Sequence, residues 1–236
     1  MFPIRDHNPP ARPALVTWAL VAANVAVFGL TWADPPLVRH LALYPLAVTM
    51  GQPGPGLATH MFVHAGLLHL AGNLLFLWVF GPNLEDQMGR LSFLVFYLAC
   101  GLLAAGAHVA WGPHSVVPMV GASGAIAGVM GGYLLLFPRA RVDVIAVLGP
   151  ILRRYRVRAW VVLGAWVVLQ LGMGLAAQGP AGTAYWAHVG GFAAGLVLTL
   201  PLFVRRGGRR FWARNDGRPP HPPRLAPSRV PPVRRR

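Results

Sequence analysis

Six long runs without a charged residue alternate with short polar segments along this chain. The runs cover residues 14–33, 57–84, 91–111, 120–137, 159–178 and 183–204. A helix needs about 20 apolar residues, within a range of roughly 17–25, to cross the hydrocarbon core of a bilayer. The pattern therefore predicts an all-α polytopic membrane protein whose six transmembrane helices form one bundle over residues 14–204.

The segments outside the runs are polar and rich in proline and arginine. Residues 1–13 are predicted to form a short N-terminal segment. Residues 205–236 are predicted to form a disordered tail, because they are poor in apolar residues, and their arginines favour contact with anionic lipid headgroups. Residues 139–158 enclose an apolar patch, 144–152, that is too short to cross a bilayer. We expect this patch to be an interfacial or loop segment.

The composition agrees with a membrane protein and indicates its orientation. Of the 236 residues, 55% are hydrophobic and 11% are charged, whereas soluble domains carry about 25% charged residues. The formal net charge of +15 comes from arginine alone, a usage typical of a GC-rich genome, and with six helices every arginine except Arg39 falls on one side. Basic loops stay on the cytoplasmic side. We therefore expect both termini to be cytoplasmic, in a bacterial plasma membrane, and no nucleic-acid partner.

Four polar residues from three different runs are predicted to share one depth in the bilayer. Ser123 begins the fourth run, His188 lies early in the sixth, and His69 and Asn73 lie in the second. With a rise of 1.5 Å per residue, all should lie within roughly 10 Å of the outer boundary. His69 and Asn73 are four residues apart and so share a helix face. Polar groups at this depth are costly and mark functional sites.

Glycines at four-residue spacing suggest how these helices meet. They are Gly124, Gly128 and Gly132 in the fourth run and Gly191 and Gly195 in the sixth. Strips of small residues let two helices approach closely, which would bring Ser123 within hydrogen-bonding reach of His188. A lone G-x-S-G sequence can also be a simple packing face, with Ser123 bonded to its own helix. The histidine at the same depth favours a functional site.

The chemistry that this set supports is nucleophilic catalysis. A serine hydroxyl needs a base to take its proton, and an oxyanion needs preorganised donors. Ser123 and His188 supply the first pair, and His69, Asn73 and the Ser123 amide supply the donors. No run contains Asp or Glu, so the arrangement would be a dyad. The spacing of His60 and His64 allows a metal site, but the chain lacks an H-E-x-x-H sequence. We expect no metal and no cofactor.

Four segments in order along the chain resemble the rhomboid family of intramembrane serine proteases. The segments are His64-Ala-Gly-Leu-Leu-His-Leu-Ala-Gly-Asn73, Glu85-Asp-Gln-Met-Gly-Arg90, Gly121-Ala-Ser-Gly124 and His188-Val-Gly-Gly-Phe-Ala-Ala-Gly195. The likeness covers residues 14–204. It implies a six-helix bundle that cleaves membrane-anchored protein substrates near the outer face. A rhomboid-like scaffold without proteolytic activity is the alternative, although such proteins typically lack the serine or the histidine.

The resemblance also implies roles for individual residues. Ser123 would be the nucleophile and His188 the general base, while His69 and Asn73 would line the oxyanion hole. His64 would support the loop beneath the first span. The remaining matched positions would be structural, and they are Glu85, Gly89, Gly121, Gly124, Gly191 and Gly195.

The chain departs from the family pattern at two places. Many rhomboids have a Trp-Arg or similar pair ahead of the second span, where this chain has Pro55-Gly56. Some have an aromatic residue four positions after the serine, stacked on the histidine, where this chain has Ala127. The second departure leaves open how His188 is oriented. One means of holding His188 in place is packing at Gly190 and Gly191.

Overall fold

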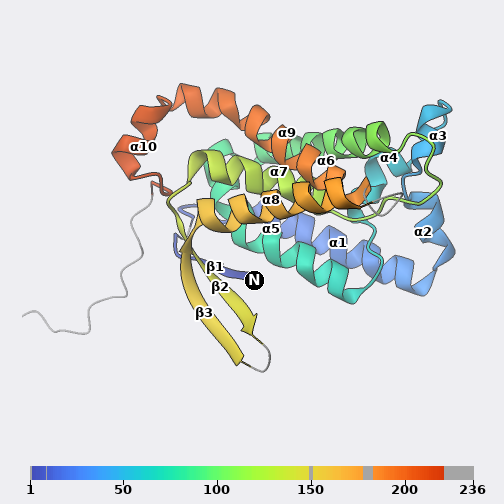
Figure 1. The fold of residues 1–236 in the computed structure, drawn as a ribbon, viewed down its shortest axis with the longest axis horizontal. Coiled ribbons are helices and arrows are strands. Elements are labelled where there is room, and N and C mark those ends of the chain that lie inside the picture. Colours follow the sequence, from blue (N-terminus) through green and yellow to red (C-terminus); the bar gives the residue numbers. More distant parts are fainter. Residues whose placement is uncertain (1, 9, 149–150, 178–182, 221–236) are drawn as a thin grey trace, which may run out of the picture.

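The computed structural model describes residues 2–8, 10–148, 151–177 and 183–220, which form a helical bundle with a small sheet at one end (Figure 1). The long helices are α1 (Leu15–Ala33), α5 (Leu67–Met88), α6 (Arg90–Trp111), α8 (Ala159–Ala176) and α9 (Thr183–Arg205). The shorter helices are α2 (Pro36–Leu41), α3 (Pro45–Thr49), α4 (Gly56–Thr59), the 3-10 turn His60–Phe62, α7 (Ser123–Leu136) and α10 (Arg209–Asn215). The strands are β1 (Phe2–Asp6), β2 (Arg141–Leu148) and β3 (Ile151–Arg158).

Five of the helices are long and apolar enough to cross a membrane, and the fourth predicted run forms a shorter one. Helix α7 has 14 residues, which corresponds to about 21 Å at 1.5 Å per residue. Its residues from Gly124 to Tyr133 are all buried, and it packs against α5, α6, α8 and α9. The six predicted runs thus become five long helices and one short, largely buried helix.

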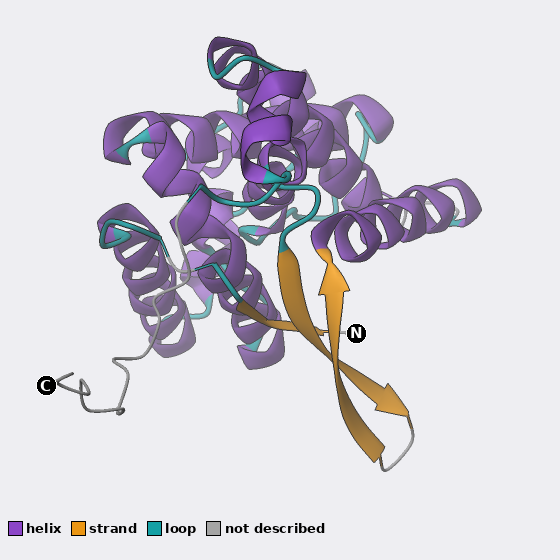
Figure 2. Ribbon diagram, turned by 90° about the vertical axis from the view of Figure 1, so that its left-hand side faces the viewer, coloured by secondary structure: helices purple, strands orange, loops and turns teal. Residues whose placement is uncertain are grey.

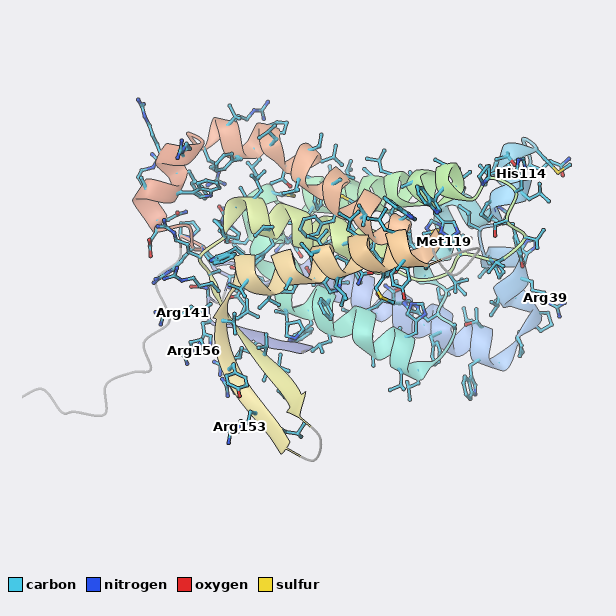
Figure 3. The ribbon with its side chains drawn as sticks, viewed as in Figure 1. Arg39, His114, Met119, Arg141, Arg153 and Arg156 are labelled. Atoms are coloured by element: carbon cyan, nitrogen blue, oxygen red, sulfur yellow. The ribbon has the colours of Figure 1, made fainter. Side chains whose placement is uncertain are left out.

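The two ends of the bundle differ in charge. Arg141, Arg153 and Arg156 lie at the end that carries the sheet, whereas Arg39 and His114 lie at the opposite end (Figure 3). We call these the arginine end and the loop end, the latter because it carries α2, α3 and α4. The separation agrees with the charge asymmetry that the sequence predicts.

Helix α5 extends further than the sequence predicts. The second uncharged run ends at residue 84, but α5 continues to Met88 and ends at Gly89, whose φ of +83° favours glycine. Glu85 is only 3% exposed. Its carboxylate accepts hydrogen bonds from the backbone amides of Val16 (3.0 Å) and Thr17 (2.8 Å) and from the Thr17 hydroxyl (2.8 Å). These contacts cap the first turn of α1 and hold the end of α5 in helical form.

Glycines bring α9 against α7, as the sequence predicts, but the two helices use them differently. A Cβ atom at Gly191 or Gly195 would collide with the carbonyl oxygen of Gly124 or Gly128. On α7, Gly132 faces Thr199 of α9, whereas Gly124 and Gly128 mainly face α6, where the side chains of Ala104 and Cys100 fill the space. Helix α7 therefore packs against the backbone of α9 on one side and against small side chains of α6 on the other.

We expect Gly195→Ala to lower the thermal stability of the protein in detergent. The added methyl group must displace backbone of α7, and overpacking of this kind typically costs about 1–3 kcal/mol. Gly172→Ala in α8 is the matched control, because a Cβ atom there meets nothing within 4 Å. Equal unfolding temperatures for the two variants would show that α7 and α9 do not depend on this contact.

The three strands form an antiparallel sheet in the order β1-β2-β3 (Figure 2). The loop alternative for residues 144–152 was therefore wrong for the residues that the structure describes, which lie in paired strands, whereas their interfacial position stays a prediction. The β-branched residues Val142, Val144 and Ile145 favour a strand, and Val142 and Val144 are fully buried. The N-terminal segment is also structured, since its residues 2–6 form β1, one edge strand of the sheet.

Buried acidic residues join the sheet together and to the bundle. Asp143 accepts a hydrogen bond from His7 (2.6 Å) and pairs with Arg154. Burial acts to raise the pKa of Asp143, but the bonds from His7 and Arg154 outweigh it and the pKa lies below its usual value. Asp6 accepts hydrogen bonds from the Tyr133 hydroxyl (2.6 Å) and the Asn83 amide (2.6 Å), and burial raises its pKa despite these donors. Strand β1 is thereby tied to α5 and α7.

The tail is ordered further than the sequence predicts. Residues 209–215 form α10, and the side chain of Phe211 in this helix is buried. The indole of Trp212 donates a hydrogen bond to the carbonyl of Leu135 (3.0 Å), at the end of α7. Residues 205–236 are poor in apolar residues on average, but Phe211 and Trp212 lie together and supply the contacts that hold α10 against the bundle. Residues 221–236 lie outside the described part of the chain, and contact of the tail with lipid stays a prediction.

Candidate active site

The candidate site is built on the turn that precedes α7. Gly121 has a φ of +120°, and a Cβ atom there would lie 2.8 Å from the imidazole of His69. The amide of Gly121 donates to the carbonyl of His60 (2.9 Å). Only glycine lets the chain pass over His69 in this conformation. The turn places Ser123 as the first residue of α7, with its hydroxyl at the helix N-terminus.

The structure brings Ser123 and His188 together. The Ser123 Oγ atom lies 2.9 Å from the Nε2 atom of His188, across the α7–α9 contact. This is hydrogen-bonding distance for a hydroxyl that donates to a ring nitrogen. The Gly124–Gly191 approach, one residue beyond Ser123, explains why two side chains 65 positions apart can meet.

A third residue, which the sequence analysis missed, holds the other side of the histidine. Gln170 of α8 is 8% exposed, and its Oε1 atom lies 2.7 Å from His188 Nδ1. If Ser123 donates to Nε2, then Nδ1 carries the ring proton and donates to Gln170, which selects one tautomer. Trp166, one turn earlier on α8, packs on the ring with centroids 5.7 Å apart. The sequence signal that could have identified Gln170 is its amide side chain within a run of apolar residues.

His69 and Asn73 lie on the opposite wall. The Asn73 amide donates to the carbonyl of His69 (3.1 Å), and His69 Nδ1 accepts from the amide of Ala65 (3.4 Å). His64 contacts His69 edge to face, with ring centroids 5.1 Å apart, and its Nδ1 atom lies 3.3 Å from the Phe62 carbonyl. His64 therefore braces the segment that carries His69.

These side chains surround a cavity of about 250 Å³. Four polar groups face it, from Ser123, His188, His69 and Asn73, and the rest of the wall is apolar. The apolar lining residues are Leu68, Gly72, Phe76, Ile126, Met130 and Trp166. A small number of convergent polar groups within an apolar wall is typical of a ligand-binding site.

Histidines near the site do not form a metal cluster among the residues that the structure describes. No group of three His, Cys, Asp or Glu side chains in this part of the chain is arranged to hold an ion. His60 instead engages the carbonyl of Gly56 through Nδ1 (2.9 Å). Its contact supports the short turn below the site.

Comparison with known proteins identifies the family. The family model for the Rhomboid domain matches residues 55–205. The chain belongs to the rhomboid family. Together with its five long apolar helices, this makes it an integral multi-pass membrane protein of all-α type.

Several curated rhomboid proteins are similar to the chain. It is 32% identical to the mitochondrial Rhomboid protein 1 of Saccharomyces cerevisiae over 210 residues, which are 81% of this chain and 56% of that protein. It is 32% identical to the Rhomboid protease GluP of Bacillus subtilis over 152 residues, or 64% of this chain and 27% of that protein. For the human mitochondrial presenilin-associated rhomboid-like protein the identity is 31%, over 53% of this chain and 34% of that protein. The chain thus spans about half or less of these relatives.

Within this rhomboid, the contact with Gln170 bears on the departure at Ala127. Ala127 is fully buried and has no ring to stack on His188. The proposed alternative, packing at Gly190 and Gly191, is present: Gly190 faces Ala107 and Gly191 faces Gly124. That packing sets the position of the helix, whereas the hydrogen bond to Gln170 sets the rotation of the ring.

Proposed function

We propose that this rhomboid is an intramembrane serine endopeptidase that cleaves membrane-anchored protein substrates with a Ser123–His188 dyad. The observation that carries the proposal is the 2.9 Å contact between Ser123 Oγ and His188 Nε2 within the cavity. The similarity to a named rhomboid protease supports it. No metal or cofactor is needed for this chemistry.

The reaction has two halves. Ser123 Oγ forms a bond to the peptide carbonyl carbon while its proton passes to His188 Nε2. The carbon–nitrogen bond then breaks, and His188 returns the proton to the leaving amine. Water attacks the acyl-enzyme with His188 again as base, which releases the acid and restores the serine. Asn73, His69 and the Ser123 amide are proposed to stabilise the oxyanion in both halves.

The site would act near the outer face of a bacterial plasma membrane, with both termini in the cytoplasm. The arginine end carries Arg141, Arg153 and Arg156, and basic segments favour the cytoplasmic side. Ser123 begins a helix that runs toward that end, so the dyad lies on the side of the loop end. Water would then reach the acyl-enzyme from the outer side.

The direct test is cleavage of a model transmembrane substrate by the purified protein in lipid vesicles. We expect wild type to release two fragments and Ser123→Ala to release none. Ser115→Ala is the matched control, since Ser115 lies in the loop before α7 and its exposed hydroxyl accepts a hydrogen bond from the nearby Val117 amide (3.2 Å). Cleavage by neither wild type nor control, with substrate still bound, would favour the scaffold alternative.

Asn73→Ala is expected to lower kcat about tenfold with little change in KM. Loss of a single oxyanion donor can cost about 10²–10³ in rate, but His69 and the Ser123 amide share the task here. Measuring kcat and the unfolding temperature for Asn73→Ala and His69→Ala separates a catalytic role from a structural one. Unchanged kcat with lowered stability in both variants would remove them from the catalytic set.

A further inference from the structure

A second cavity lies toward the arginine end and shares no lining residue with the candidate active site. It has a volume of about 460 Å³ and is enclosed by β1, the segment after it, and the adjoining ends of α1 and α5. Its polar wall includes Arg5, Arg12 and Asn8. Its other wall includes Trp18 of α1 and Trp78 of α5. Nothing in the proposed proteolytic mechanism uses this cavity.

The polar wall carries excess positive charge. Arg5 and Arg12 are both exposed and both line the cavity. Asp6 is the acidic residue in the lining, and its carboxylate already accepts bonds from Tyr133, Asn83 and the Asn8 amide. Because those donors occupy Asp6, Arg5 and Arg12 are the charged groups that a ligand in this cavity would meet, although Arg12 also borders a neighbouring pocket that contains Glu85 and Asp86. Arginine favours phosphate, which it can bind through two parallel hydrogen bonds.

The apolar wall faces lipid. Trp18 is 45% exposed and Trp78 is 56% exposed, although each lies on a helix apolar enough to span a membrane. Trp18 lies in the first turn of α1, at the boundary where the polar N-terminal segment gives way to the apolar run. Tryptophan is enriched at such boundaries, with its ring at headgroup level. The cavity therefore combines cations on the polar side with apolar surface on the membrane side.

We propose that this cavity binds one anionic phospholipid. Its phosphate would be held by Arg5 and Arg12, and the upper part of its acyl chains would lie against Trp18 and Trp78. Basic pockets between transmembrane helices are suited to such headgroups. A free phosphate ion shares the first interaction but not the second, so the two ligands can be told apart.

The occupant would also have a structural consequence. It would bridge β1, which is bonded to Tyr133 of α7 through Asp6, to the lipid-facing surfaces of α1 and α5. Lipid binding should therefore raise the unfolding temperature of the protein. The inference stands apart from the proposed proteolytic activity, because its readouts are binding and stability.

The experiment measures lipid retention and unfolding temperature for the full chain in neutral detergent, after addition of phosphatidylglycerol, phosphatidylcholine or inorganic phosphate. We expect phosphatidylglycerol alone to be retained and to stabilise the protein. The double variant Arg5→Gln/Arg12→Gln should weaken this binding about tenfold or more, since each basic residue near an anionic surface contributes about 1 kcal/mol. Trp18→Leu/Trp78→Leu should also weaken it.

The matched control removes two arginines from the same end but outside the cavity. Arg153 and Arg158 are exposed on β3, and Arg153→Gln/Arg158→Gln should change phosphatidylglycerol binding less than about twofold. Equal losses in the two double variants would overturn the site in favour of diffuse attraction. Equal stabilisation by phosphatidylcholine, or by inorganic phosphate, would also overturn it. If a double variant of the cavity has a lowered unfolding temperature before lipid is added, its two single variants are measured instead. Each single variant must still weaken phosphatidylglycerol binding more than the control variant does.

Discussion

Ser123→Ala, His188→Ala and the double variant are expected to reduce cleavage of a transmembrane substrate to the same residual rate. The reason is that Ser123 Oγ and His188 Nε2 are 2.9 Å apart and act as one unit. Residues that act together are not additive: in a soluble serine protease, loss of either one costs about 10⁶ in kcat, nearly as much as loss of the whole set. We expect each single variant here to fall by at least about 10⁴.

The measurement is a single-turnover rate with excess enzyme in vesicles, together with the unfolding temperature of each variant. Both substitutions remove atoms from the wall of a cavity, so the fold should persist. A further loss of at least tenfold in the double variant, relative to either single one, would contradict a shared proton transfer. A Ser123→Ala protein that cleaves at the wild-type rate would exclude this serine as the nucleophile.

Gln170→Leu is expected to lower kcat by about 10- to 100-fold and to leave KM nearly unchanged. The substitution leaves the Nδ1 proton of His188 without the acceptor that lies 2.7 Å away. A buried group that loses its partner costs about 1–3 kcal/mol, and the ring can then rotate away from Ser123. Gln170 does not touch the reacting atoms, so its role is to position His188.

Gln170→Glu is the matched variant, because glutamate keeps the size of the side chain and can accept the same hydrogen bond. It should retain much more activity than Gln170→Leu and should shift the pH profile of kcat, since a carboxylate beside Nδ1 changes how the ring binds protons. A merely structural role for Gln170 would move neither the profile nor the ratio of kcat to KM. Equal activity in the leucine and glutamate variants would remove Gln170 from the positioning role.

The sequence by itself determined the membrane architecture, and it also selected Ser123 and His188, whose side chains lie 2.9 Å apart in the structure. In lipid, every backbone polar group must be hydrogen-bonded within a helix or a closed β-barrel. The uncharged runs are about twice as long as the 9–11 residues of a spanning strand, which favours helices. Helical rise then places Ser123, His188 and Asn73 at one depth, whatever the details of packing. Gly191 and Gly195 mark a close approach because only hydrogen fits between two backbones. These features depend on local periodicity, which a single sequence displays.

Other features were decided by the tertiary structure. The sheet is completed by β1, which comes from the other end of the chain and pairs with β2. Helix α5 continues past Glu85 because that carboxylate caps α1. Gln170 reads as one polar residue in an apolar run until α8 packs beside α9 and brings its amide to His188. Each of these rests on partners distant in sequence, and their contact energies outweigh local propensity, which carries no information about such partners.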